Sequence, residues 1–139
     1  MERLLVDADR ARLGEVTSFA VGDLYSAYCG SAYRVELAVE ELFVNVCRHA
    51  YGGGKGPVEI TRELAPDGEG GEMLEITVAD RGRPFNPFTE APVPELEGEL
   101  AGRRVGGLGV HLVKTMTDGF AYSGADGRNE TVIRFRLDG

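Results

Sequence analysis

The chain has 139 residues, of which 42% are hydrophobic and 27% are charged, and it carries a net charge of -8. These values predict one globular domain over residues 1–139 with a core of its own, and they argue against general disorder. Non-specific nucleic-acid binding depends on clustered Lys and Arg side chains, which an acidic chain does not favour. No apolar run approaches the roughly 20 residues that span a bilayer, and the N-terminus lacks a secretory signal's apolar region. We therefore expect a cytoplasmic protein that binds neither nucleic acid nor membrane.

The cysteines, histidines and glycines limit the kinds of site further. Cys29 and Cys47 have neither a metal-ligand spacing nor a disulfide framework, so we expect small apolar residues in a reducing compartment, where free cysteines are usually buried. Only two histidines are present, which gives a histidine metal site little support. The 20 glycines cluster between regular elements, where turns and loops belong.

The first two predicted elements are a strand and a helix. Residues 2–7 alternate weakly between apolar and polar side chains, which indicates a short edge strand. Asp7 or Asp9 is then a candidate N-cap for a helix that continues to residues 29–30.

The central helix is the strongest pattern in the chain. Apolar residues recur at helical spacing through residues 32–50, Ser31 can cap the start, and glycines follow Tyr51 at the end. Glu41 and Asn45 stand one turn apart, so both lie at one border of the apolar face and point the same way. This pair is either an ordinary solvated border or the floor of a pocket.

The second half of the chain predicts two hairpins with a long irregular segment between them. Strands are expected over residues 57–64 and 73–79, and over 120–123 and 131–137. Residues 82–107 contain four of the six prolines and no clear periodicity, which is typical of a functional lid or of disorder. A short helix follows over residues 108–116.

The order of elements predicts the fold class. Two adjacent hairpins favour a mainly antiparallel sheet, and three helices can cover only one of its faces. We therefore expect an α+β two-layer sandwich without repeats or a domain boundary.

Two further segments bear on the pocket hypothesis. The strand that ends at Asp80 is followed by Gly82 and a proline, which is either an ordinary turn or a positioned carboxylate. Residues 106–110 place glycines at the start of a helix, either as a linker or as backbone amides that approach an anion. In this order within one small domain, the three segments are more specific than any of them alone.

Together the segments resemble the N box and the two glycine boxes of the GHKL ATP-binding superfamily, whose members include gyrase, heat-shock chaperones, histidine kinases and MutL. The superfamily has the Bergerat fold. The forms E-E-x-F-x-N-x-x-x-H-A-Y and D-R-G-x-P-F-N-P look closest to the bacterial anti-sigma-factor serine kinases, and the similarity runs from about residue 35 to the C-terminus.

The resemblance implies a role for each matching residue. Glu41 would be the general base for an incoming serine hydroxyl, and Asn45 would bind Mg²⁺ beside the ATP phosphates. Asp80 would accept a hydrogen bond from the adenine amino group, with Gly82 letting the base lie close. The remaining expected nucleotide contacts are Thr131 on the last strand, the amides of Gly107 and Gly109, and Arg103 or Arg104 in a lid of about residues 85–105. These lid arginines can equally be solvated.

The chain departs from the superfamily pattern in three places. Pro84 stands where a second glycine is common, and Asn86 stands where these kinases often have Asp. The acidic run of residues 95–99 is unusual beside a polyphosphate, and suggests a lid that swings outward or meets a partner.

The resemblance implies an ATP-dependent serine/threonine kinase that phosphorylates a small anti-sigma-factor antagonist protein. It leaves open whether a sigma factor is also bound and whether the chain forms a homodimer. The alternative is a nucleotide-responsive binding module that regulates a partner without phosphate transfer. An ATP-hydrolysing machine or a histidine kinase module ranks below both, since we expect neither a transducer domain nor a phosphoacceptor helix in this chain. A purely structural domain is the remaining reading.

Overall fold

The computed structural model describes residues 1–90 and 105–138, and its strands form one five-stranded sheet. The strand order is β1-β2-β3-β5-β4, and every neighbouring pair is antiparallel. The strands are β1 (Glu2–Asp7), β2 (Pro57–Pro66), β3 (Glu72–Asp80), β4 (Gly119–Ser123) and β5 (Asn129–Leu137). The predicted strands and the antiparallel sheet are confirmed, and β1 is an edge strand as expected.

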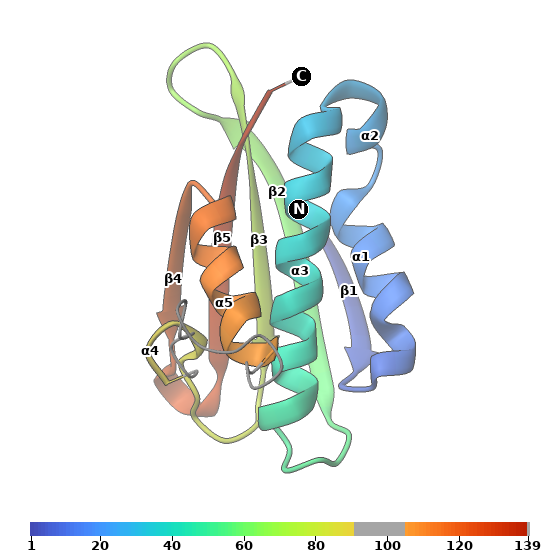
Figure 1. The fold of residues 1–139 in the computed structure, drawn as a ribbon, viewed down its shortest axis with the longest axis vertical. Helices are drawn as coiled ribbons and strands as arrows, with labels where there is room; N and C mark the ends of the chain where they lie inside the picture. Colours follow the sequence, from blue (N-terminus) through green and yellow to red (C-terminus); the bar gives the residue numbers. More distant parts are fainter. Residues whose placement is uncertain (91–104, 139) are drawn as a thin grey trace.

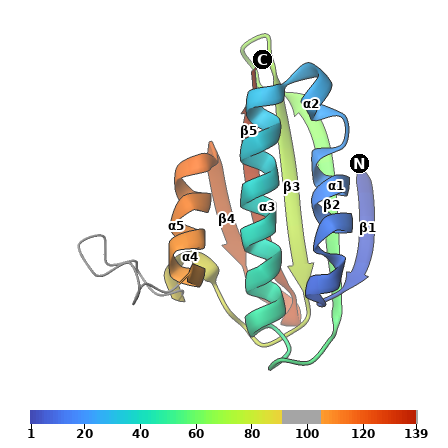
Figure 2. The same cartoon turned by 45° about the vertical axis from the view of Figure 1, so that its right-hand side comes forward.

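The helices form the second layer. In the described part of the chain they are α1 (Leu13–Val21), α2 (Leu24–Ala27), α3 (Cys29–His49), α4 (Pro87–Glu90) and α5 (Val105–Met116). Figures 1 and 2 show the three longer helices, α1, α3 and α5, side by side over one face of the sheet, with α3 in the middle. The predicted α+β two-layer sandwich is therefore confirmed.

The core lies between these two layers and explains why the central helix forms. The apolar positions at helical spacing on α3 are buried, and they meet the inward-facing residues of the central strands, which alternate along β2, β3 and β5 as a half-buried sheet requires. The largest fully buried side chains of this core are Phe43, Phe135, Leu42, Ile60, Leu74, Ile76 and Ile133.

The helix expected to continue to residues 29–30 is interrupted. Asp9 does cap a first helical turn, because its carboxylate accepts a hydrogen bond from the Ala11 amide at 3.0 Å. However, α1 ends at Gly22, whose φ of 56° is in the left-handed region that favours glycine. The short helix α2 follows this turn, so the prediction of one uninterrupted helix is wrong.

Ser31 does not cap α3. The helix begins at Cys29, and Ser31 is buried within it. Its hydroxyl accepts a hydrogen bond from the amide of Asp138 at 3.0 Å, which ties the end of the chain to α3. The cap prediction was wrong because the partner of Ser31 is more than a hundred residues away in the sequence.

The predicted lid lies only partly within the described structure. Its start, residues 85–90, includes the short helix α4, whereas residues 91–104 are outside the described residues. Both lid arginines and the acidic run of residues 95–99 are therefore outside the description. The helix after the lid begins at Val105, three residues before the predicted start.

Two other expectations concern membranes and cysteines. In the described ranges, no helix has the length and apolar character needed to cross a membrane. Both cysteines are free, as predicted. Cys29, the first residue of α3, is exposed, so the expectation that this thiol is buried is wrong.

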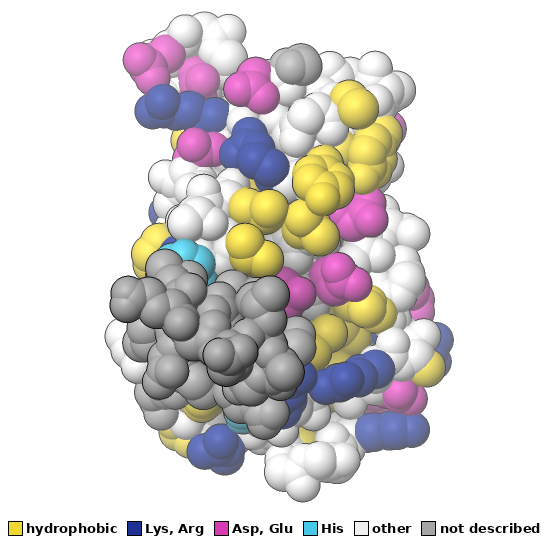
Figure 3. Space-filling model, in the orientation of Figure 1, with side chains coloured by type: hydrophobic (Ala, Val, Ile, Leu, Met, Phe, Trp, Pro, Cys, Tyr) yellow, Lys and Arg dark blue, Asp and Glu magenta, His cyan; other side chains and the backbone are white. Residues whose placement is uncertain are grey.

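The outer face of the helical layer carries an apolar surface. Figure 3 shows apolar side chains gathered over α2 and the neighbouring end of α3. Among the large apolar side chains of these two helices, Tyr25 is 47% exposed and Tyr33 is 58% exposed.

Candidate functional site

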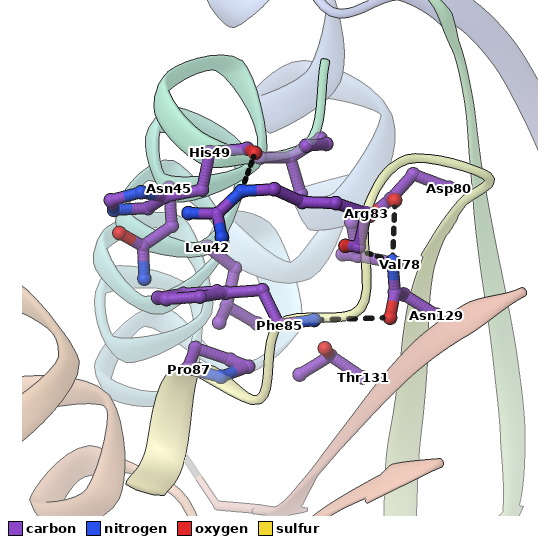
Figure 4. Close-up of a pocket in the computed structure, with 12 residues that line it drawn as sticks. Leu42, Asn45, His49, Val78, Asp80, Arg83, Phe85, Pro87, Asn129 and Thr131 are labelled. Carbon is purple, nitrogen blue, oxygen red and sulfur yellow. Dashed lines mark hydrogen bonds between the residues drawn. The ribbon is translucent and has the colours of Figure 1, made fainter. Parts of the chain in front are cut away.

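A cleft opens between the C-terminal half of α3 and the ends of β3 and β5 (Figure 4). The empty space in this cleft, counted together with the open solvent at its mouth, is about 360 Å³. The described residues that line it are Leu42, Asn45, Val46, His49, Ala50, Val78, Asp80, Arg83, Phe85, Pro87, Asn129 and Thr131. The cleft therefore brings together Asn45, Asp80 and Thr131, three of the residues singled out in the sequence.

Asn45 presents an unsatisfied amide at the cleft. The residue is 5% exposed, and no described group forms a hydrogen bond with its Nδ2 atom. A buried polar group without a partner costs stability, and such groups are rare in folded proteins. An unpaired side-chain nitrogen that lines a cleft is thus suited to donate a hydrogen bond to a ligand.

Asp80 stands at the end of β3 with half of its carboxylate occupied. Its Oδ1 accepts hydrogen bonds from the Gly82 amide and from Asn129 Nδ2, both at 2.9 Å. No described residue donates to Oδ2, although the residue is only 7% exposed and lines the cleft. One oxygen of Asp80 is therefore available to a donor on a ligand.

Gly82 is required by the close approach of two backbone segments. A Cβ at this position would lie 2.0 Å from the carbonyl oxygen of Ala50, at the end of α3. The next amide, from Arg83, donates to the same carbonyl oxygen at 2.9 Å. The glycine thus lets the loop after β3 pack on α3, which sets the width of the cleft.

Phe85 extends across the cleft toward α3, as Figure 4 shows. Its ring stacks on the ring of His49 with centroids 4.3 Å apart, and the Arg83 guanidinium lies 5.6 Å from its centroid. Arg83 Nε also donates to the His49 carbonyl oxygen at 3.0 Å. Burial, followed by the nearby Arg48 and Arg83 charges, lowers the pKa of His49, so its ring is neutral at pH 7. The cleft therefore has two uncharged aromatic rings at its wall.

Glu41 is placed differently from the other candidates. It lies on α3 one turn before Asn45, partly buried, but it is not among the described residues that line the cleft. Burial, followed by the neighbouring Glu40 charge, raises the pKa of Glu41, while Arg48 lowers it. A raised pKa favours proton acceptance, as expected of a general base.

Of the remaining candidate residues, two lie in α5 and one lies outside the described residues. Gly107 lies in the first turn of α5, where backbone amides lack helical partners, whereas Gly109 lies just beyond that turn. Arg104 lies outside the described residues.

The sequence analysis missed Asn129. This residue is 6% exposed on β5, and its amide bonds both to Asp80 and to the loop that carries Phe85. Since side chains two apart on a strand share a face, its position two residues before Thr131 could have revealed it. It was instead assigned to the turn before the strand, because the predicted strand begins at residue 131.

The described residues contain no group of three or more His, Cys, Asp and Glu side chains that could hold a metal ion alone. A cation at this site would thus depend on oxygen atoms of a ligand as well as on the protein. Asn45 fits such a site, because it lines the cleft with a side-chain amide oxygen and Mg²⁺ commonly combines few protein oxygens with phosphates and water.

Comparison with known proteins decides the family. The sequence model of the histidine kinase-like ATPase domain matches residues 6–137. The chain belongs to the histidine kinase-like ATPase domain family. Membership confirms the GHKL superfamily that the motifs indicated, and it implies an ATP-binding site. A comparison of this chain with curated protein sequences found no match.

Two solved structures share the fold. The crystal structure of the RsbU and RsbW domains of Rv1364c from Mycobacterium tuberculosis has a TM-score of 0.63 and 17% identity. This match covers 99% of the chain but only 33% of the other protein's chain, so the histidine kinase-like ATPase domain spans a third of that length. The mycobacterial sensor histidine kinase MprB has a TM-score of 0.50 and 16% identity, with 96% and 98% of the two chains covered. At these identities the similarity concerns the fold.

Proposed function

We propose that this chain is an ATP-dependent serine/threonine protein kinase of the anti-sigma-factor type. The observation that carries the proposal is the shared cleft of Asn45 and Asp80, in which an unpaired amide and a half-occupied carboxylate lie at one site. The family implies ATP, and the fold similarity to a structure containing an RsbW domain supports this branch of the family.

In this proposal each described residue acts on one part of the nucleotide. Asp80 accepts a hydrogen bond from the adenine amino group through Oδ2, because Oδ1 is already bonded within the protein. Thr131 lies on the same cleft wall and contacts the base side of the ligand. The amides of Gly107 and Gly109 at the start of α5, together with Arg104, face the phosphates.

The residue that would hold Mg²⁺ beside the phosphates is Asn45, through its side-chain amide oxygen at the cleft. The cation would neutralise phosphate charge during transfer. The helix holds this group rigidly, since Leu42 and Phe43 beside it are in the core.

Glu41 accepts the proton of the serine hydroxyl. The pKa of Glu41 is raised chiefly by burial, which makes its carboxylate a stronger base. Because Glu41 lies one turn from Asn45 but outside the described cleft lining, the hydroxyl has to approach along the helix rather than from the adenine end.

The proposed phosphate acceptor is a small anti-sigma-factor antagonist protein, and a sigma factor is a further proposed partner. The apolar surface over α2 and α3, with exposed Tyr25 and Tyr33, supports a protein partner, because exposed apolar patches mark contact sites. The chain is proposed to work as a homodimer in the cytoplasm.

A pull-down from the native cell, followed by incubation of the recovered proteins with ATP, tests this proposal. We expect phosphate on a serine or threonine of a small bound protein. The variant Glu41→Ala should still bind ATP but lose this phosphorylation, with a rate at least about a hundredfold lower. Glu40→Ala is the matched control, since it removes the neighbouring carboxylate and should keep the normal rate. Normal phosphorylation by Glu41→Ala contradicts the assignment of the base.

The alternative is a nucleotide-responsive binding module without phosphate transfer. The position of Glu41 outside the described cleft lining favours this candidate. It predicts that the recovered partner gains no phosphate in mass spectra, while ATP still changes the amount of partner recovered.

A further inference from the structure

The amide of Asn129 is the most fully bonded polar side chain at the cleft. Its Nδ2 donates to Asp80 Oδ1 at 2.9 Å and to the Arg83 carbonyl oxygen at 3.0 Å, with the Gly82 carbonyl oxygen at 3.4 Å. Its Oδ1 accepts from the Tyr122 hydroxyl and from the Phe85 amide, the latter at 3.4 Å. This one side chain therefore joins β3, β4, β5 and the loop after β3.

The partners fix which way the amide faces. Every group on the Nδ2 side is an acceptor, namely one carboxylate and two carbonyl oxygens, and both groups on the Oδ1 side are donors. Turning the amide over would place an oxygen against three acceptors and an NH₂ group against the Phe85 amide, whereas the Tyr122 hydroxyl can accept as well as donate. Such unpaired buried groups are costly, so only one orientation is stable.

The orientation of Asn129 determines that of Asp80. The Asn129 Nδ2 and the Gly82 amide both bond to Oδ1, which restricts the orientation of the carboxylate group. Oδ2 remains without a donor from any residue described, although Asp80 lines the cleft. A carboxylate held at one oxygen by two donors presents the other at a fixed place, and such preorganisation lowers the cost of binding a ligand.

Tyr122 supports this arrangement from the edge strand. It lies on β4 opposite Thr131 of β5, and its hydroxyl reaches Asn129 rather than solvent. Its ring is partly buried against the core, so the position of the hydroxyl follows from packing. Tyr122 thus orients Asn129, which in turn orients Asp80.

We propose that Asn129, oriented by Tyr122, is a positioning residue that makes the site specific for a purine with an amino group at position 6. The inference rests on the proposed binding of ATP, and it adds two residues that the family motifs do not contain. Asn129 acts through Asp80, by keeping Oδ2 where the amino group of the base needs an acceptor. Without it only the Gly82 amide holds the carboxylate, and the site distinguishes a base with the amino group from one without it less well.

The test compares ATP with purine riboside triphosphate, in which a hydrogen replaces the amino group and N1 stays an acceptor. Calorimetric titration of the full chain gives the ratio of the two affinities. Wild-type protein should prefer ATP by about tenfold or more, because a hydrogen at position 6 leaves Oδ2 of Asp80 without a donor. The ratio reports the orientation of Asp80, and a loss of fold stability alone would not change it in protein that is still folded.

Two variants and one control make the test specific. Asn129→Asp keeps the shape of the side chain but replaces the donor with an acceptor, so it should reduce the ATP preference by about tenfold, toward a ratio of one. Tyr122→Phe removes only the hydroxyl and should reduce the preference by about threefold. Tyr28→Phe is the matched control, since it loses a hydrogen bond to Glu72 at the other end of β3 from Asp80 and should keep the wild-type ratio.

The outcomes separate this inference from the proposed function. Wild-type protein that binds neither triphosphate contradicts the proposed function itself. Wild-type protein that prefers ATP, with the same preference in both variants and a lowered melting temperature, overturns the inference and makes Asn129 a structural residue only. If Asn129→Asp does not fold, Tyr122→Phe decides, since an unchanged ratio in that variant also overturns the inference.

Discussion

Both ends of α3 place polar side chains at the core, but the hydrogen bonding of these side chains differs between the two ends. At the N-terminal end Ser31 accepts a hydrogen bond from the Asp138 amide, and Arg34 donates to the carbonyl oxygens of Met116 and Arg136. At the other end Asn45 has an amide nitrogen without a described partner. The comparison teaches that burial alone does not mark a site, because the polar groups at the N-terminal end form hydrogen bonds that connect α3 to α5 and to the last strand. At the C-terminal end one side-chain nitrogen is left for a ligand to bind.

The largest expected effect concerns the backbone contact at the cleft end of α3. Gly82→Ala would place its Cβ 2.0 Å from the Ala50 carbonyl oxygen, so the loop and helix must separate. We expect a loss of about 3 kcal/mol in the free energy of unfolding, measured by denaturant titration. Gly14→Ala is the control, because a Cβ there meets nothing within 4 Å. It should change stability little or raise it slightly within the helix. Equal effects of the two variants would show that the loop does not depend on this contact.

The next effect compares the polar groups at the two ends directly. Ser31→Ala removes a buried hydroxyl that accepts a hydrogen bond from the Asp138 amide, and it should cost about 1–2 kcal/mol in the free energy of unfolding. Asn45→Ala removes an amide nitrogen that has no partner, so unliganded protein should lose less than about 1 kcal/mol. Chemical denaturation without nucleotide measures both. A larger loss for Asn45→Ala than for Ser31→Ala would mean that Asn45 is mainly structural.

The smallest effect is the pH dependence of Glu41. Its pKa in the folded chain is raised above the ordinary value of 4.5, so its favourable contribution is complete below that value and is lost as pH rises through the folded pKa. Glu41→Gln should therefore stabilise the protein at pH 7, and the gain should vanish below about pH 4.5. We expect well under about 1 kcal/mol, since solvent screens a partly exposed charge. Denaturant titrations of both proteins across this pH range check the sign, and a destabilised variant at pH 7 would contradict it.

The sequence predicted the elements better than the contacts between them. The helical period of α3 and the alternation of the strands are local patterns, and both were confirmed. The break at Gly22 was missed because one glycine within a helical pattern is often tolerated. Ser31 was assigned as a cap because its partner, Asp138, comes from the far end of the chain. Pairing of β3 with β5 rather than β4 is likewise a property of the folded chain.

The same limit applied to the site. Asn45 and Asp80 could be named from their motifs, and they do line one cleft. The spacing of Asn129 from Thr131 shows that the two side chains share a face of the strand, but its bonds to Asp80 and to the Phe85 loop exist only in the folded chain. The contact of Phe85 with His49 joins residues of two motifs, and their spacing alone did not predict it.

Calorimetric titration of ATP into wild-type protein and Asn45→Ala, each with and without Mg²⁺, tests the central claim most directly. If the cleft holds Mg-ATP through Asn45 and Asp80, wild-type protein binds one ATP per chain, and Mg²⁺ strengthens this binding by about tenfold or more, while Asn45→Ala loses the Mg²⁺ dependence. Absence of ATP binding by wild-type protein, or the same Mg²⁺ dependence in Asn45→Ala, would contradict it.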